Sequence, residues 1–300
     1  KYMHFDQMLP KKELKEIEGS FNTRAVTLKW LRSVTNTYAE ERLFEIIEHN
    51  LQSQLKLLSY VNSLPDNLKM VRISSDLLPL YTHPEFAYFY NIPAFRKFIE
   101  DGFSAIGEYA RSQKIRLSMH PGQFCVLASD RDDVVERSLQ EFEYHADMIR
   151  MMGYGKKFQD FKCNIHISGA IGVEGILKIW PRLSEVAKNT ITFENEERKY
   201  GLDECLQVSH LCPVVLDIHH CWINEGEYID REDDRLKRVV ESWRGVRPTM
   251  HYSQSKEILI DAGISTVDKI NMDETLKHFN KKDLCAHSDR TVSYTHLRAH

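Results

Sequence analysis

The sequence contains no apolar run that approaches the roughly 18 residues a helix needs to cross a membrane. Its first residues also lack the basic stretch followed by an apolar segment that marks a secretory signal peptide. These two absences argue against a membrane-spanning protein and against a secreted one. We therefore expect a cytoplasmic protein with no membrane partner.

The cysteines are few and widely spaced. None belongs to a close C-x-x-C pair, the spacing typical of zinc ribbons and redox motifs, and several lie in or beside apolar stretches. We expect reduced thiols in a cytoplasmic protein rather than a disulfide framework. The six are Cys125, Cys163, Cys205, Cys212, Cys221 and Cys285.

The sequence also has no excess of positive charge. It holds 40 Lys and Arg against 44 Asp and Glu, a formal net charge of −4. A protein coated for nucleic acid would be basic, so any nucleic-acid binding must use a local patch. With 42% hydrophobic residues and 300 residues in all, the chain can fill one large core. That length suits a (β/α)8 barrel or two smaller domains.

The stretch Pro213–His220 carries the most chemistry. Its apolar residues predict a short buried strand, which ends in Asp217, His219 and His220. Carboxylate oxygen and imidazole nitrogen at a strand end suit a divalent ion such as Zn²⁺ or Mn²⁺. The plain alternative is a strand followed by a helix, with Asp217 as the helix cap and the histidines on the loop.

The chain repeats this pattern of a short apolar run that ends in His, Glu or Asp. A closed parallel barrel explains the repetition, because the C-terminal ends of all its strands meet on the face where such enzymes keep their active sites. The other examples are Ile115–His120, Phe161–Gly169 with His166, Thr190–Glu194, Pro248–His251 and Asp283–His287.

Strands alternate with helices along the chain, which indicates βα units and a parallel sheet. We count seven strands where a closed barrel has eight. They are Pro213–His220, the five similar stretches and Met70–Ser74. The fold class predicted is therefore α/β, a TIM (β/α)8-type barrel that lacks its first strand. The predicted helices are 37–63, 95–113, 132–152, 173–188 with a break at Pro181, 202–210, 231–243 and 272–279.

We expect residues 1–291 to form a single barrel domain. Residues 292–300 show no helical or strand pattern and look like translated vector sequence, so we predict that they are a non-native tail.

Several segments together resemble the UV damage endonuclease family, with family-like spacing from about Phe21 to Asp289. That family is a TIM barrel related to metal-dependent apurinic-site endonucleases. The resemblance implies a DNA repair endonuclease that nicks double-stranded DNA 5′ to UV photoproducts, using divalent ions, most often Mn²⁺, with Zn²⁺ or Mg²⁺ possible. The segments are 72–79 with Thr82–Pro84, 117–124, 164–169, 193–197, 216–220 and 286–289.

The resemblance also assigns roles to residues. Glu194, His120, His166 and Asp217 would be catalytic, with Glu194 as a bridging carboxylate. Gln123 and Phe124 would probe damaged DNA. The metal ligands implied are His83, His120, His166, Glu194, Asp217, His220, His251 and His287.

The chain departs from the family at three places. The first strand is absent before Lys1, an acidic ligand expected after His287 is absent, and Thr249 stands where some members have lysine. These departures imply a homologue, but an incomplete one.

Four cationic residues next to the ligand strands could bind DNA phosphates, although solvated charge explains each of them as well. They are Arg198, Lys199, Arg244 and Arg247. We expect a monomer. Two alternatives remain open: a sugar isomerase or epimerase barrel, which would need a closed pocket and a catalytic lysine, and a truncated damage-binding module without catalysis.

Overall fold

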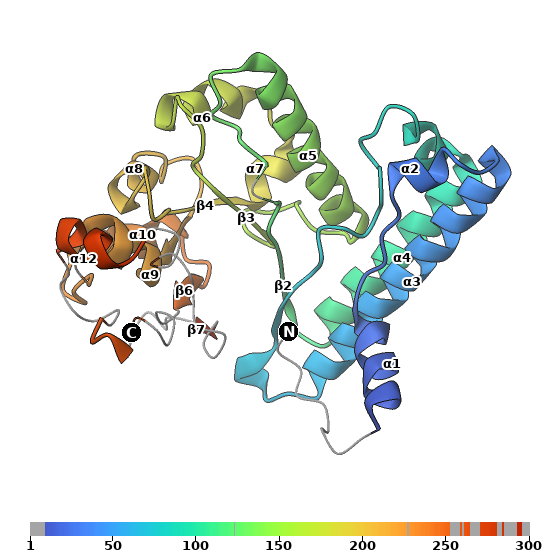
Figure 1. Cartoon of the computed structure of the whole chain (residues 1–300), viewed down its shortest axis with the longest axis horizontal. Helices are drawn as coiled ribbons and strands as arrows, with labels where there is room; N and C mark the ends of the chain where they lie inside the picture. The colour runs from blue at the N-terminus through green and yellow to red at the C-terminus, as the bar shows by residue number, and fades with distance from the viewer. Residues whose placement is uncertain are drawn as a thin grey trace. The chain divides into compact units, whose positions relative to one another are not determined.

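The structure is a computed structural model that describes residues 10–122, 124–226, 228–252, 259, 261–264, 271–280, 284 and 293–295. The chain divides into two compact units (Figure 1). The N-terminal unit is Lys1–His120 with Tyr144–Lys156, and the C-terminal unit is Pro121–Glu143 with Lys157–His300.

The N-terminal unit is mainly helical, with one pair of strands. Strands β1 and β2 are parallel, with Val71 opposite Leu117. Helices α3 and α4 run side by side (Figure 1). The elements are α1 (Lys11–Phe21), α2 (Leu28–Leu31), α3 (Asn36–Asn62), η1 (Asp66–Leu68), β1 (Met70–Arg72), η2 (Ala87–Asn91), α4 (Pro93–Ser112), β2 (Arg116–Met119) and the second half of α5 (Asp132–Met151).

Helix α3 forms where the sequence carries an apolar stripe of helical period. Leu43, Ile46 and Ile47 on that stripe are fully buried. The helix begins after Thr35, whose side-chain oxygen accepts the backbone N–H of Tyr38 and so caps the first turn. Tertiary packing of one face therefore sets the position of this long helix.

The C-terminal unit alternates strands with helices. Helices α8 and α10 pack on the strands β4 and β5. The elements are the first half of α5, β3 (Lys162–His166), α6 (Val173–Ile179), η3 (Trp180–Arg182), α7 (Glu185–Thr190), β4 (Ile191–Glu194), α8 (Leu202–Gln207), β5 (Val214–Asp217), α9 (Ile218–Glu225), α10 (Asp234–Ser242), β6 (Met250–Tyr252), α12 (Met272–His278) and β7 (Ser293–Thr295).

Strands β3 to β6 are parallel neighbours in chain order. Every residue of β4 and β5 is buried, as expected for strands covered on both faces. Since parallel strands point the same way, their C-terminal ends lie along one edge of the sheet. The short strand β7 pairs with β6 in the antiparallel direction.

These elements give an α/β fold of the TIM-barrel type. Six of the seven predicted strands are present as β1 to β6, and the break at Pro181 appears as η3 between α6 and α7. Of the predicted strand at 283–287, only Leu284 is described, and it is helical. The single-domain boundary and the non-native tail stay predictions, although β7 lies in the stretch where we expected no strand.

No helix in the described part of the chain is both long and apolar enough to span a bilayer.

Candidate metal centre

Five predicted ligands of the C-terminal unit come from neighbouring elements at one edge of its sheet. His166, Glu194 and Asp217 are the last residues of β3, β4 and β5. His251 lies on β6, and His220 lies in the first turn of α9. The strand register places His166 beside Glu194 and Asp217 beside His251. The parallel sheet thus brings together residues far apart in the sequence.

Glu194 lies at the centre of this group and is 2% exposed. Its Oε1 accepts a hydrogen bond from His251 Nδ1 at 2.6 Å and lies 3.8 Å from His220 Nδ1. Its Oε2 lies 3.9 Å from His166 Nε2 and accepts a hydrogen bond from the side-chain amide of Asn164. One buried carboxylate therefore faces three imidazoles.

Asp217 divides its two oxygens between two tasks. Oδ1 accepts the backbone N–H of His220 at 2.9 Å, which caps α9. Oδ2 lies 3.6 Å from His251 Nδ1 and 3.9 Å from His220 Nδ1. Asp217 is therefore a helix cap, as the plain alternative predicted. It also belongs to the group of predicted ligands around Glu194. The histidines, however, lie on the helix and not on a loop.

Charge pairing shifts the pKa values of these groups. Burial acts to raise the pKa of Asp217, but the charge of His220 and the hydrogen bond from His251 outweigh it and hold that pKa below its usual value. Burial acts to lower the pKa values of His220 and His251, and the carboxylates of Asp217 and Glu194 raise them above the usual value. The buried carboxylates thus require positive charge beside them.

The donor set suits a divalent cation. Glu194, Asp217 and His220 each offer one ligand atom, and these atoms lie within 4.8 Å of one another. Carboxylate oxygen with imidazole nitrogen is a ligand set for Zn²⁺ and similar transition-metal ions. A cation would supply the positive charge that protons on His220 and His251 supply otherwise.

Polar residues that the sequence did not single out support these ligands. Thr192 Oγ1 donates to Asn164 Oδ1 at 2.7 Å, and Asn164 in turn donates to Glu194. Asn164 lies two residues before His166, so both point to the same side of β3. That period of two, together with the place of Asn164 in the family-like segment 164–169, is the signal that could have found it. Glu197, on the loop after β4, reaches within 3.8 Å of His220 Nε2.

The remaining predicted ligands and DNA probes belong to the N-terminal unit, to the loop that carries Phe124, or to residues outside the description. His120 follows β2 in the N-terminal unit, where its carbonyl accepts the hydroxyl of Ser75 at 2.9 Å. His83 lies in a loop of that unit, and its Nδ1 accepts the N–H of Glu85. Gln123 and His287 lie outside the described residues, whereas Phe124 is 83% exposed.

The four predicted phosphate contacts separate into two locations. Arg198 and Lys199 are exposed on the loop that follows Glu194. Arg244 and Arg247 lie between α10 and β6, before the strand, and therefore at the opposite strand ends. The Arg244 guanidinium donates to the carbonyls of His210 and Leu211 and stacks on Phe158. These positions favour Arg198 and Lys199 over Arg244 and Arg247 as phosphate contacts.

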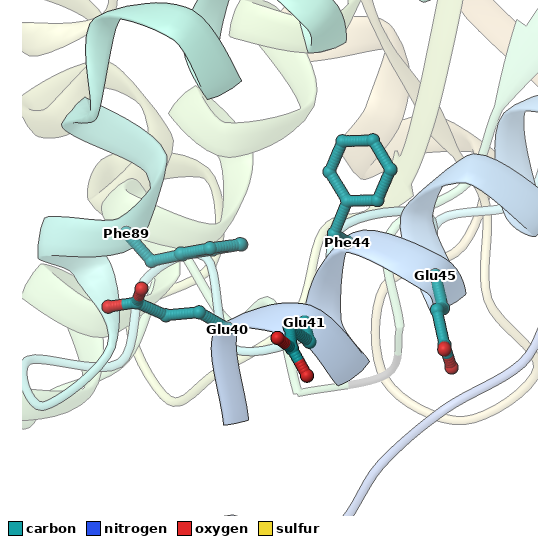
Figure 2. Close-up of a pocket in the computed structure, with 5 residues that line it drawn as sticks. All are labelled: Glu40, Glu41, Phe44, Glu45 and Phe89. Carbon is teal, nitrogen blue, oxygen red and sulfur yellow. The ribbon is translucent and has the colours of Figure 1, made fainter. Parts of the chain in front are cut away.

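A separate hollow of about 420 Å³ lies in the N-terminal unit (Figure 2). It is lined by Glu40, Glu41, Phe44, Glu45 and Phe89. Its three carboxylates would repel the phosphates of DNA. The hollow shares no residue with the candidate metal centre.

Comparison with known proteins assigns the family. The model of the family described as UV-endonuclease UvdE matches residues 9–283. A UV DNA damage endonuclease from Clostridium perfringens (strain 13 / Type A) is 27% identical over 277 residues, which cover 87% of this chain and 64% of that protein. The one from Bacillus velezensis (strain DSM 23117 / BGSC 10A6 / LMG 26770 / FZB42) is 29% identical over 271 residues, 86% of this chain and 81% of that protein.

Among solved structures, the crystal structure of SacUVDE superposes with a TM-score of 0.64 at 27% identity, and the match covers 78% of this chain and 76% of that one. The chain spans less than two thirds of the length of the Clostridium protein. The family match nevertheless extends over most of the chain and includes the strand ends that carry His166, Glu194, Asp217 and His251. This chain belongs to the UV-endonuclease UvdE family.

Proposed function

We propose that this protein is a metal-dependent DNA repair endonuclease that cuts the phosphodiester backbone 5′ to UV photoproducts. The observation that carries the proposal is the buried pair Glu194 and Asp217, which faces His220 and His251 at one sheet edge. The relatives named UV DNA damage endonuclease support the choice of substrate.

The residues supply what phosphodiester hydrolysis requires. A divalent ion held at this edge would lower the pKa of a bound water and offset charge on the phosphate oxygens. Glu194 and Asp217 would hold the ion by their carboxylates, with His166, His220 and His251 as nitrogen ligands. The amide of Asn164 fixes one oxygen of Glu194, so the other remains directed toward the imidazoles. We propose Mn²⁺ as the ion and keep His83, His120 and His287 as further predicted ligands.

Recognition of the lesion is assigned to the loops at the same strand ends. Phe124 is an exposed aromatic ring able to stack against a base, and a lesion that stacks badly is cheapest to open. Arg198 and Lys199 would contact phosphates. Gln123 is kept as a second probe, and the protein would act as a monomer. The five described cysteines are free, buried thiols, which supports a place in the cytoplasm.

The test is a nicking assay on irradiated plasmid with Mn²⁺, comparing the wild-type protein with Glu194→Gln. Glutamine keeps the shape of the side chain but removes the charge that would hold the ion. We expect the nicking rate to fall about 100-fold or more, the usual effect of removing a group that stabilises charge in the transition state. Circular dichroism should be unchanged.

Glu45→Gln is the matched control. Glu45 is an exposed glutamate of the N-terminal unit, paired with Arg42 at 2.8 Å, and its neutralisation should leave nicking intact. Wild-type nicking by Glu194→Gln would exclude a catalytic role for Glu194. Gel-shift binding of irradiated DNA by a wild-type protein that does not nick would favour the damage-binding module instead.

A further inference from the structure

Asn195 follows Glu194 directly and is fully buried. It lies just beyond the end of β4, where the ladder of backbone hydrogen bonds between β4 and β5 stops. Its position gives it two neighbours that both belong to the metal centre, Asp217 and His220.

The side chain of Asn195 makes two hydrogen bonds to the backbone of Asp217. Its Oδ1 accepts the N–H of Asp217 at 2.8 Å, and its Nδ2 donates to the carbonyl of Asp217 at 3.0 Å. A primary amide carries one acceptor oxygen and an NH₂ donor, so it can bond a backbone N–H and C=O as the backbone of a neighbouring strand would. Asn195 therefore continues the ladder by one residue, with its side chain in place of backbone.

The backbone of Asn195 contacts the other ligand. Its carbonyl oxygen lies 2.9 Å from His220 Nδ1. Since a carbonyl can only accept, Nδ1 carries the proton, and Nε2 is then the nitrogen that a neutral ring would offer to a metal ion. A histidine ligand commonly has its second nitrogen fixed in this way.

We propose that Asn195 is a positioning residue that holds Asp217 and His220 in the geometry required for metal binding. This inference rests on the metal centre of the proposed function. Asn195 does not itself contact the ion. It fixes the backbone from which the Asp217 carboxylate projects and directs the ring of His220 from the same residue.

Replacing Asn195 by alanine removes both side-chain bonds and leaves the N–H and C=O of Asp217 without these partners. The strand end can then shift, and the Asp217 carboxylate with it. Loss of such a supporting partner typically lowers metal affinity about 10- to 100-fold. Asn195→Gln keeps the amide but places it one methylene too far, so it should also lower the affinity.

The chain offers a matched control in Asn50, a fully buried asparagine on α3 of the N-terminal unit. It accepts the N–H of Arg24 at 2.7 Å and donates to the carbonyls of Arg24 and Leu77, both at 3.1 Å. Asn50→Ala therefore removes the same kind of bond between a side chain and the backbone, but on a helix that carries none of the proposed ligands.

The experiment measures the binding of Mn²⁺ alone to the full chain, by electron paramagnetic resonance of free Mn²⁺, together with urea unfolding. We expect Asn195→Ala to lower the affinity for Mn²⁺ about 10- to 100-fold while Asn50→Ala leaves it unchanged at a comparable loss of stability. If Asn195→Ala does not fold, Asn195→Gln is measured in its place.

Equal effects of the Asn195 and Asn50 variants on affinity, or none from Asn195, would overturn the proposal. Failure of the wild-type protein to bind Mn²⁺ would overturn it as well. A wild-type protein that binds Mn²⁺ with the expected difference between variants, but does not nick irradiated DNA, would refute the proposed function and leave the role of Asn195 standing.

Discussion

At the scale of single residues, Asp217 links a structural task to a chemical one. One oxygen caps α9 by accepting the N–H of His220, and the other faces the rings of His220 and His251. The cap orients the first turn of α9, and that turn carries His220. The same carboxyl group therefore positions one proposed ligand and is itself another.

The two tasks can be separated by substitution. Asparagine is as good a helix cap as aspartate, whereas alanine is a poor one. We expect metal-free Asp217→Ala to be about 1 kcal/mol less stable than Asp217→Asn, the usual cost of losing a cap. Both variants should lose Mn²⁺ affinity, because both lack the carboxylate. Urea unfolding and metal binding check the two halves of this prediction; equal stability of the two variants would show that the cap contributes nothing.

The grouping of the strand-end residues was predictable from the sequence because each is a His, Glu or Asp at the end of an apolar run; their roles as ligands stay predictions. Asn164, Thr192 and Asn195 were not predictable, since buried amides and hydroxyls occur in many cores and their partners are set by strand register. Arg244 was placed near the site because it adjoins a ligand strand. It precedes the strand, however, and parallel strands put preceding and following residues at opposite ends.

At the scale of elements, a half-buried cluster joins α4 to α5 in the N-terminal unit. Arg96 on α4 contacts Asp147 on α5 at 2.9 Å, and Tyr81 donates a hydrogen bond to the same carboxylate. Burial acts to raise the pKa of Asp147, but the hydrogen bonds from Tyr81 and Arg150 and the charge of Arg96 outweigh it, so the pKa lies below its usual value.

This lowered pKa predicts how stability depends on pH. The folded carboxyl group binds a proton less tightly than the unfolded one, so the stabilisation is fully present above about pH 4, the ordinary aspartate pKa. It is lost as the pH falls through the folded pKa. Asp147→Asn should cost about 1.5–3 kcal/mol at pH 7, the value of a hydrogen bond to a charged group. The difference from wild type should shrink below pH 4.

Urea unfolding of both proteins between pH 7 and pH 3 measures this difference. Asp101→Asn is the control, because Asp101 pairs with Lys97 where both side chains are largely exposed, and such pairs contribute little. A difference that grows in acid would contradict the assignment.

The long helices could be predicted because each has one apolar stripe, as in α3 and α4. Helix α9 could not, because it follows β5 without a turn and buries every residue from Ile218 to Ile223. A helix that is buried on all sides has no polar face and therefore no amphipathic period. Its sequence signals were only the residues at its two ends, Asp217 as a cap and Gly226 after the last turn, and the sequence offered this helix only as an alternative interpretation.

At the scale of the whole molecule, the charge distribution limits how the DNA of the proposed function could bind. The formal net charge is −4, and the hollow of the N-terminal unit is lined by carboxylates. If the proposed function holds, DNA would meet a local set of cations and not a generally basic surface. The loop after β4 offers Arg198, whose side chain is 59% exposed, and Lys199.

Salt dependence distinguishes this loop from other cations. Each phosphate contact contributes about one unit to the slope of log affinity against log salt concentration. Arg198→Ala should reduce that slope by about 1 and weaken binding to irradiated and intact duplex alike, because a phosphate contact carries no lesion information. Arg244→Ala should change neither the slope nor the affinity, since its guanidinium already donates to the carbonyls of His210 and Leu211 at the other strand ends.

Fluorescence anisotropy with Ca²⁺ in place of Mn²⁺, at several salt concentrations, measures both variants on both duplexes. If Arg244→Ala reduced the slope and Arg198→Ala did not, DNA would have to contact the opposite edge of the sheet from Glu194, and the proposed active site would be on the wrong face.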